Sequence, residues 1–339
     1  MTKNQHILIT RFSALGDVAM LVPVVFSLAK QYPDLRISVL SQDFIRPIFS
    51  SFPPNVEFVG ANIKKDYKGI FGLTRLFFEL RKKHISAVAD MHDVLRTKFL
   101  RFLFNITGIK TRHIDKHREG KRNLCRENNK VFIQQPTSFD NYLEVLKKLG
   151  FPVVLDFKSI IPEEQLEKKN PNAIGIAPFA AHKGKIYPLK KMTEVISLLV
   201  AKEKEIFLFG GGKNELEEFH KWQAMFGKDK ITVVGDIIKK DLFAEIKLMS
   251  SLSCMISMDS ANQHLASLAG TRVVSVWGAT HPFAGFMAYG QKESDCVQID
   301  LPCRPCSVFG NKPCIFGDFR CLKNIEPQRI VEKSLEINS

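Results

Sequence analysis

Polar residues suited to phosphate binding follow four predicted strands in the second half of this 339-residue chain. Lys183 and Lys185 follow the strand "AIGIAPF", and a glycine run with Glu215 follows "EIFLF". "MDSANQH" follows "CMIS", and "GATHP" follows "VVSVW". Ligands of open α/β sheets bind outside the carboxyl ends of the strands. Lysines, hydroxyls, glycines that permit close approach and a helix N-terminus together suit a nucleoside diphosphate.

Each of these residues also has a purely structural interpretation. Glycines after strands often only form turns, and Asp259 followed by Ser260 is typical of a helix N-cap. His264 can be a buried core histidine, and Lys185 can be a solvated surface lysine. Their joint placement at successive strand ends favours the phosphate-binding hypothesis.

Alternating strands and helices are expected to position these residues. In the first half, the predicted strands are "HILIT", "RISVL", "NVEFVG" and "ISAVADM", and "NYLEVLKKLG" predicts a helix that ends at Gly150. After a polar segment at 162–172, five further strands alternate with four helices. The pattern predicts an α/β protein of two doubly wound units, at 1–161 and 172–325, and a closing helix at 326–339.

Charge and hydropathy narrow the function classes. The net charge is +14, and residues 1–160 hold 26 Lys or Arg against 14 Asp or Glu, so the first half is strongly basic. This asymmetry favours an anionic partner for the first half. No apolar stretch reaches the length of a membrane span, and the N-terminus does not resemble a signal peptide. We therefore expect a cytoplasmic protein.

Four motifs occur in order between residues 11 and 282: "RFSALGDV", "KIYP", "MDSANQHLASLAG" and "VWGATHP". "ISAVADMHDVLRTKFL" and "FDNYLEVLKKLG" lie between the first two, so the likeness covers nearly the whole chain. Together these motifs resemble glycosyltransferase family 9, the heptosyltransferases of lipopolysaccharide core assembly. The resemblance implies a GT-B fold, in which two Rossmann-like domains face each other across a cleft. The first domain would hold the acceptor and the second the nucleotide sugar.

The resemblance also implies residue roles. Asp17 falls on the catalytic base of the family, and Lys185 falls on a lysine that contacts donor phosphate. The implied donor-binding positions are Asp259, Ser260, Ala261 and His264 in the D-[TS]-G-x-x-H element, Gly278 and Thr280 in the G-x-T-x-P turn, and Glu215 near an acid that reaches the ribose. Ala261 replaces the usual glycine and Tyr187 a common tryptophan, but neither change removes a charged or hydroxyl group.

An acid in the first strand-to-helix turn suits acceptor chemistry. A carboxylate within reach of the acceptor hydroxyl can take its proton as the new C–O bond forms. The N-terminus of the following helix keeps Asp17 ionised, and attack opposite the diphosphate inverts the anomeric centre. The structural alternative is that Asp17 only caps its helix.

Metal-binding patterns are weak in this sequence. It contains no D-x-D pair, and the nearest acids, Asp90 and Asp93, have the wrong spacing. Lys185 and a helix dipole can carry the leaving-group charge instead, so we expect no metal and no other cofactor. The cysteines 303, 306, 314 and 321 form C-x2-C-x7-C-x6-C, which leaves open a structural zinc knuckle or reduced packing thiols.

A basic segment at 110–122 is the candidate acceptor contact. We expect a loop on the acceptor side, in which Arg118, Lys121 and Arg122 bind acidic sugars and phosphates of a glycolipid at the inner membrane surface. A solvated, solubilising surface is the alternative.

The leading hypothesis is an inverting, metal-independent transferase that moves a heptose or similar sugar from an ADP-sugar to a lipopolysaccharide core acceptor. We expect a monomer peripheral to the inner membrane. A nucleotide-sugar epimerase of GT-B architecture is the alternative enzyme. A nucleic-acid-binding protein is suggested only by charge, because the basic segments lack the interleaved aromatic residues that stack on bases.

Overall fold

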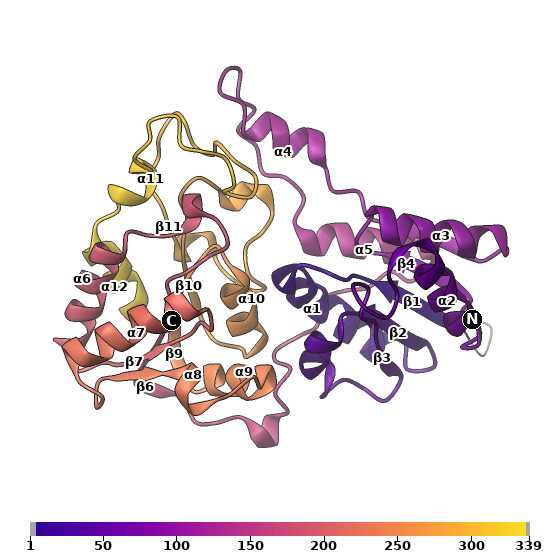
Figure 1. The fold of residues 1–339 in the computed structure, drawn as a ribbon, viewed down its shortest axis with the longest axis horizontal. Coiled ribbons are helices and arrows are strands. Elements are labelled where there is room, and N and C mark those ends of the chain that lie inside the picture. The colour runs from indigo at the N-terminus through magenta and orange to yellow at the C-terminus, as the bar shows by residue number, and fades with distance from the viewer. Residues whose placement is uncertain (1–4, 337–339) are drawn as a thin grey trace. The chain divides into compact units, whose positions relative to one another are not determined.

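The chain folds into two compact units, in a computed structural model that describes residues 5–336 (Figure 1). Unit 1 comprises the chain up to Lys116 together with Ser138–Ile160. Unit 2 comprises His117–Thr137 and the chain from Ile161 onward. Each unit contains one parallel β-sheet covered by helices.

Unit 1 is built on a five-stranded parallel sheet with the strand order β3-β2-β1-β4-β5. The strands are β1 (His6–Thr10), β2 (Arg36–Ser41), β3 (Val56–Gly60), β4 (Ala87–Asp90) and β5 (Lys110–His113). The central strands are buried along their length, because helices cover both faces of the sheet. This is why they consist of nearly continuous Ile, Leu, Val and Ala.

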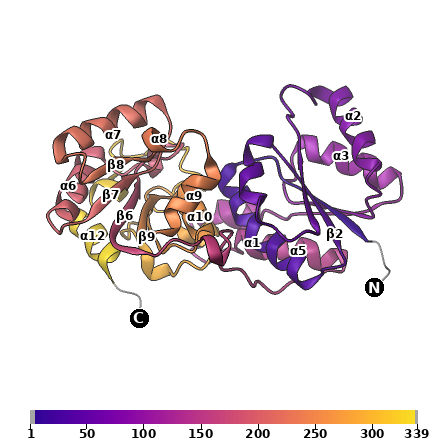
Figure 2. The same ribbon diagram turned by 90° about the horizontal axis from the view of Figure 1, so that it is seen from below.

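The helices of unit 1 lie on both faces of its sheet. On one face α1 (Leu15–Gln31) packs against α5 (Ser138–Leu149), and on the other α2 (Gly69–Arg81) packs against α3 (Leu95–Ile106) (Figure 2). A 3₁₀ segment, η1 (Asp43–Phe49), joins β2 to β3. The chain runs outward from β1 to β3 and then returns to β4 and β5. Right-handed crossovers in opposite directions therefore place α1 on one face and α2 and α3 on the other.

Unit 2 is built on a six-stranded parallel sheet with the strand order β11-β10-β9-β6-β7-β8. The strands are β6 (Asn170–Ala177), β7 (Glu205–Leu208), β8 (Ile231–Val233), β9 (Leu252–Met258), β10 (Val273–Val276) and β11 (Cys296–Val297). The helices that follow β6 are α6 (Leu189–Val200), α7 (Lys213–Phe226), α8 (Val234–Ile237), α9 (Leu242–Ser250), α10 (Ala261–Leu268), α11 (Arg320–Lys323) and α12 (Pro327–Leu335). The predicted closing helix is present as α12, which packs on α6.

The segment after Lys110 differs from the predicted loop. Residues 110–113 form β5 at the edge of the first sheet, and residues 118–124 form the helix α4 (Arg118–Leu124). The stretch 117–137 packs within unit 2, so the prediction that kept 1–161 in one domain is wrong for it. The physical reason is tertiary: Leu124 is fully buried, and the N–H of Gln135 donates to the carbonyl of Phe283 at 2.8 Å.

The prediction of two Rossmann-like α/β units is confirmed by the two parallel sheets with helices on their faces. Among residues 5–336, no helix combines the length and apolar character needed to cross a membrane.

Candidate active site

Asp17 lies in the first turn of α1, directly beyond the carboxyl end of β1. Its Oδ2 accepts a hydrogen bond from the backbone N–H of Ala14 at 3.0 Å and lies 2.6 Å from Nη2 of Arg11. The hydroxyl of Tyr142 donates to the backbone carbonyl of Asp17 at 3.1 Å. The carboxylate is thus held by a helix N-terminus and a guanidinium, and it remains partly exposed. Asp17 therefore makes the predicted N-terminal capping contact, and its carboxylate is partly exposed to solvent.

Sequence reasoning missed Arg11 and His92 beside Asp17. Arg11 is buried and also donates to the carbonyl of Met91, which fixes its guanidinium against Asp17. His92 lies next to the same turn, with Nδ1 3.4 Å from the N–H of Phe12. Burial, with a smaller contribution from Arg11, lowers the pKa of His92 to about 4, so its imidazole is neutral near pH 7. Arg11 stands inside the motif "RFSALGDV", but no local pattern indicates its ion pair.

Asp90 and Asp93 both form ion pairs with Arg101 in unit 1. Nη1 of Arg101 lies 2.8 Å from Oδ2 of Asp90 and 3.2 Å from Oδ1 of Asp93. Oδ1 of Asp90 also accepts the backbone N–H of His92 and of Asp93. These bonds order the turn that follows β4.

In unit 2, the Asp259 carboxylate contacts two of the predicted site residues, Lys185 and Thr280, and one residue that was not predicted, Gln263. Its Oδ2 lies 2.9 Å from Nζ of Lys185 and accepts the hydroxyl hydrogen of Thr280 at 2.8 Å. Its Oδ1 accepts from Nε2 of Gln263 at 3.3 Å. Asp259 is 5% exposed and Lys185 is 17% exposed. We call these four residues the Asp259 cluster; it joins the ends of β6, β9 and β10.

Arg304 holds the turn that contains Gly278 and Thr280. It was not among the predicted site residues. Nε of Arg304 donates to the carbonyl of Gly278 at 2.6 Å, and Nη2 donates to the carbonyl of Thr280 at 3.0 Å. The N–H of Ala279 donates to the carbonyl of Gly184, which ties this turn to the turn of Lys185. A Cβ at position 278 would lie 2.4 Å from Cγ of Leu322. Close packing therefore requires glycine there.

The N-terminus of α10 lies beside the Asp259 cluster. Ser260 is the N-cap residue, and its hydroxyl lies 3.3 Å from that of Ser257. Ala261 opens the helix, and His264 is buried one turn further along. The structure thus separates two roles: Ser260 occupies the cap position, and Asp259 binds the lysine and the threonine.

Glu215 lies apart from this cluster, on the first turn of α7. Its Oε2 accepts the N–H groups of Gly211 and Gly212 at 3.0 and 3.1 Å. Two N–H groups of the glycine run are therefore engaged by Glu215, which acts as an N-terminal cap of α7 that the sequence analysis did not predict. Its predicted contact with a ribose stays a prediction.

The three basic residues predicted to bind acceptor lie on α4, a helix rather than a loop, and they differ in exposure. Arg118 and Arg122 are exposed, whereas Lys121 is buried with Nζ 4.2 Å from the ring centroid of Phe286. Lys121 therefore helps to hold α4 on unit 2 through a cation–π contact. The prediction that all three project from one loop is wrong.

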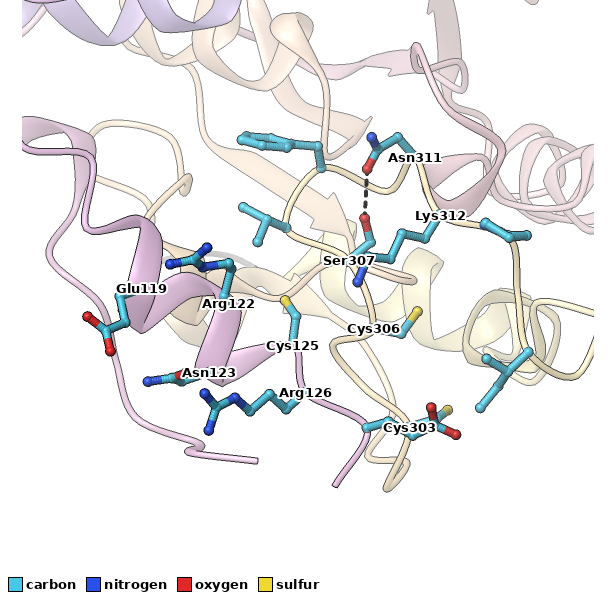
Figure 3. Close-up of a pocket in the computed structure, with 15 residues that line it drawn as sticks. Glu119, Arg122, Asn123, Cys125, Arg126, Cys303, Cys306, Ser307, Asn311 and Lys312 are labelled. Carbon is cyan, nitrogen blue, oxygen red and sulfur yellow. Dashed lines mark hydrogen bonds between the residues drawn. The ribbon is translucent and has the colours of Figure 1, made fainter. Parts of the chain in front are cut away.

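A cavity of about 730 Å³ lies between α4 and the loop 303–315 of unit 2 (Figure 3). Arg122, Arg126 and Lys312 line it, together with Glu119 and Ser307. The same loop reaches the Asp259 cluster, because the N–H of Ser307 donates to the carbonyl of Ala279. The cavity is therefore linked through one loop to the turn that holds Thr280.

All seven cysteines are free thiols. Cys303 and Cys306 line the cavity with Cys125, and burial raises the pKa of Cys321 to about 11. Among residues 5–336, no group of three or more His, Cys, Asp or Glu side chains is arranged to hold a metal ion.

Comparison with known proteins agrees with the family resemblance. The family model described as "Glycosyltransferase family 9 (heptosyltransferase)" matches residues 73–314. Lipopolysaccharide heptosyltransferase 1 of Campylobacter coli is 27% identical over 81% of this chain and 84% of its own length.

Solved structures show the same fold. A family 9 glycosyltransferase of Veillonella parvula superposes with a TM-score of 0.72 at 18% identity, over 97% of this chain and 96% of that one. The ADP-heptose lipopolysaccharide heptosyltransferase II of Escherichia coli superposes with a TM-score of 0.68 at 17% identity, over 97% of each chain.

The family match decides between a transferase and an epimerase. The family model covers most of the chain, including the Asp259 cluster and the turn that Arg304 locks. The chain belongs to glycosyltransferase family 9, the heptosyltransferase family, and is a glycosyltransferase.

Proposed function

We propose that this glycosyltransferase moves a heptose from ADP-heptose to an acidic lipopolysaccharide core acceptor, with inversion and without a metal ion. The substrate names come from the relative in Campylobacter coli and from the Escherichia coli structure. The observation that carries the proposal is the Asp259 cluster, which holds a lysine and a hydroxyl beside the N-terminus of α10.

The donor diphosphate is the leaving group, and unit 2 supplies its counter-charge. Lys185 has three N–H donors, so it can bind phosphate while one of them stays on Asp259. The N-terminus of α10 adds free backbone N–H groups and the positive end of a helix dipole. These preorganised groups stabilise negative charge as it develops on the departing phosphate, which a metal ion does in other transferases.

The acceptor hydroxyl loses its proton to Asp17 in this proposal. Arg11 and the N–H of Ala14 hold the carboxylate in one orientation. The acceptor oxygen forms a bond to the anomeric carbon while the bond from that carbon to the diphosphate breaks. Arg11 positions the base, and Asp17 is the catalytic residue.

We also propose a monomer that works at the cytoplasmic surface of the inner membrane and takes no nucleic acid. Arg118 and Arg122 then bind the anionic groups of the acceptor, with Arg126 and Lys312 available along the cavity wall. Lys121 is not among the residues that we propose to bind the acceptor, because it is buried against Phe286.

The double variant Arg118→Gln/Arg122→Gln is expected to raise the acceptor KM about tenfold and to flatten its dependence on salt, since exposed charges act on an anionic ligand and are screened. The Kd of the donor should stay unchanged. Steady-state kinetics between low and high salt measure this. The matched control is Lys202→Gln/Lys228→Gln, which removes two exposed charges elsewhere on unit 2. An unchanged acceptor KM in the α4 variant contradicts the assignment.

Thermal shift tests the identity of the donor, and transfer in EDTA tests the metal-free mechanism. ADP and ADP-heptose should raise Tm more than UDP, GDP and their sugars, because a bound ligand stabilises the folded state by mass action. Transfer of heptose to a lipopolysaccharide core acceptor should proceed at an unchanged rate in excess EDTA. Transfer that stops in EDTA and returns with added metal contradicts the metal-free mechanism. A Tm response to UDP-sugars alone contradicts the donor.

A further inference from the structure

The outer surface of α2 and α3 exposes large apolar side chains to an unusual degree. Phe71 is 93% exposed and Leu95 is 86% exposed. Four further large apolar residues on these two helices are exposed: Ile70, Phe78, Phe102 and Ile106. Soluble proteins rarely leave such residues together on one surface unless the surface binds a partner.

Helical spacing places these residues on one surface. Phe71 and Phe78 lie seven residues apart on α2, and Leu95, Phe102 and Ile106 have the spacing i, i+7, i+11 on α3. The opposite sides of both helices are buried against the first sheet, through Leu73, Leu76, Phe77 and Leu80 of α2 and Leu100 and Phe104 of α3. Figure 2 shows α2 and α3 together on the same face of this sheet, and the two helices are in contact. We infer from the helical spacing that their exposed stripes lie next to each other. We call this surface the α2–α3 face.

The α2–α3 face is also basic. Residues 64–106 contain ten Lys or Arg against four Asp or Glu. Arg75 and Lys82 are exposed along the stripe of α2, and Arg96 and Lys98 are exposed on α3. Of the acids near them, Glu79 pairs with Arg75 at 3.5 Å on the exposed side of α2, whereas Asp93 lies 3.7 Å from Lys98 and is held more closely by Arg101 at 3.2 Å. Positive charge therefore surrounds the apolar side chains.

We propose that the α2–α3 face docks unit 1 on an anionic lipid bilayer. Phenylalanine and leucine side chains enter the boundary between headgroups and acyl chains, while lysine and arginine side chains bind anionic headgroups. A second copy of the chain fits poorly, because self-association would oppose two surfaces of the same positive sign. This proposal rests on the proposed function, since an enzyme whose acceptor is a membrane-anchored glycolipid must work at the surface of the bilayer.

Vesicle flotation tests the docking. The full chain should float with vesicles of phosphatidylglycerol and phosphatidylethanolamine and remain unbound with phosphatidylcholine alone. The variant Phe71→Ser/Phe78→Ser/Phe102→Ser should lower the partition coefficient at least about tenfold. The control Met225→Ser/Ile237→Ser, which removes exposed apolar side chains from unit 2, should bind as the parent does. Arg75→Gln/Lys82→Gln/Arg96→Gln should weaken binding and flatten its salt dependence.

A fluorescence reporter gives an independent readout. Both natural tryptophans, Trp222 and Trp277, are buried, so Phe71→Trp adds the one exposed indole in the part of the chain described here. Its emission should shift to shorter wavelength with phosphatidylglycerol vesicles and stay unchanged with phosphatidylcholine. No shift at low salt overturns the proposal. So does sedimentation of the parent as a dimer that the triple serine variant converts to a monomer.

Transfer to a deacylated, water-soluble core acceptor separates this inference from the proposed function. The triple serine variant should transfer heptose to this acceptor at the parental rate, because its substitutions lie on the lipid-facing surface. A chain that makes this transfer but never binds vesicles overturns the docking surface alone. A chain that binds vesicles as described but fails to use ADP-heptose overturns the proposed function alone.

Discussion

Replacing Asp17 with asparagine is expected to lower kcat by about two or more orders of magnitude, because the amide cannot accept the proton of the acceptor hydroxyl. The Kd of the nucleotide should stay unchanged, since the residues proposed to bind it belong to unit 2. Asparagine keeps an oxygen that can accept the N–H of Ala14. Single-turnover kinetics with saturating donor, combined with calorimetric titration of ADP, measure the two effects separately.

Asp17→Asn also removes the counter-charge of buried Arg11. We expect a loss of about 1–2 kcal/mol in the free energy of unfolding, less than for a fully buried pair because Asp17 is partly exposed. Assays at temperatures below the measured Tm of the variant keep it folded, so that the loss of stability does not lower the measured kcat. Asp43→Asn is the matched control, because Asp43 forms an exposed pair with Arg46 in the same unit. Turnover close to that of the parent in Asp17→Asn would rule out Asp17 as the base.

The fold was largely predictable where local pattern and tertiary environment agree. Strands such as β1 and β9 are covered on both faces, so they appear in the sequence as apolar runs followed by polar residues. The edge strand β5 has the sequence "KTRH" and buries only Thr111. Its identity as a strand depends on pairing with β4, which no local signal indicates.

The helix α4 and its place in unit 2 could not be predicted from the sequence for a related reason. Residues 117–124 carry charge without a regular apolar stripe, so the sequence suggested an exposed loop. The helix depends on long-range contacts: Leu124 is buried in unit 2, and Lys121 lies against Phe286. Arg304 lies within a cysteine motif and was not predicted, because the two carbonyls through which it holds the turn of Gly278 and Thr280 lie 26 and 24 residues away.

The clustering of the strand-end residues in unit 2 was predictable from the sequence, but the contacts that each residue makes were not. Placing polar residues at strand ends correctly brought Lys185, Asp259 and Thr280 together. Sequence alone could not decide whether Asp259 caps a helix or binds a lysine, because both roles require an acid at the same point. For Glu215 the local capping contact is present in the structure.

Replacing Lys185 with glutamine is expected to raise the Kd of ADP about 10- to 100-fold, which corresponds to losing a hydrogen bond between charged groups. The rate of transfer should also fall, since the leaving diphosphate loses part of its counter-charge. Lys183→Gln is the matched control. Lys183 lies on the same short 3₁₀ turn but is exposed, so its variant should bind ADP almost as the parent does. Calorimetry with ADP and with adenosine measures whether the loss depends on phosphate.

Lys185 could instead act only by neutralising Asp259, and a double-mutant cycle with Asp259→Asn distinguishes the two roles. If Lys185 contacts phosphate, Lys185→Gln should weaken ADP binding in the Asp259→Asn background as well, and adenosine binding should remain unchanged. If it only balances the buried carboxylate 2.9 Å away, Asp259→Asn should make the second substitution silent. A silent second substitution, or an equal loss for adenosine and ADP, would show that Lys185 positions Asp259 and does not bind the diphosphate.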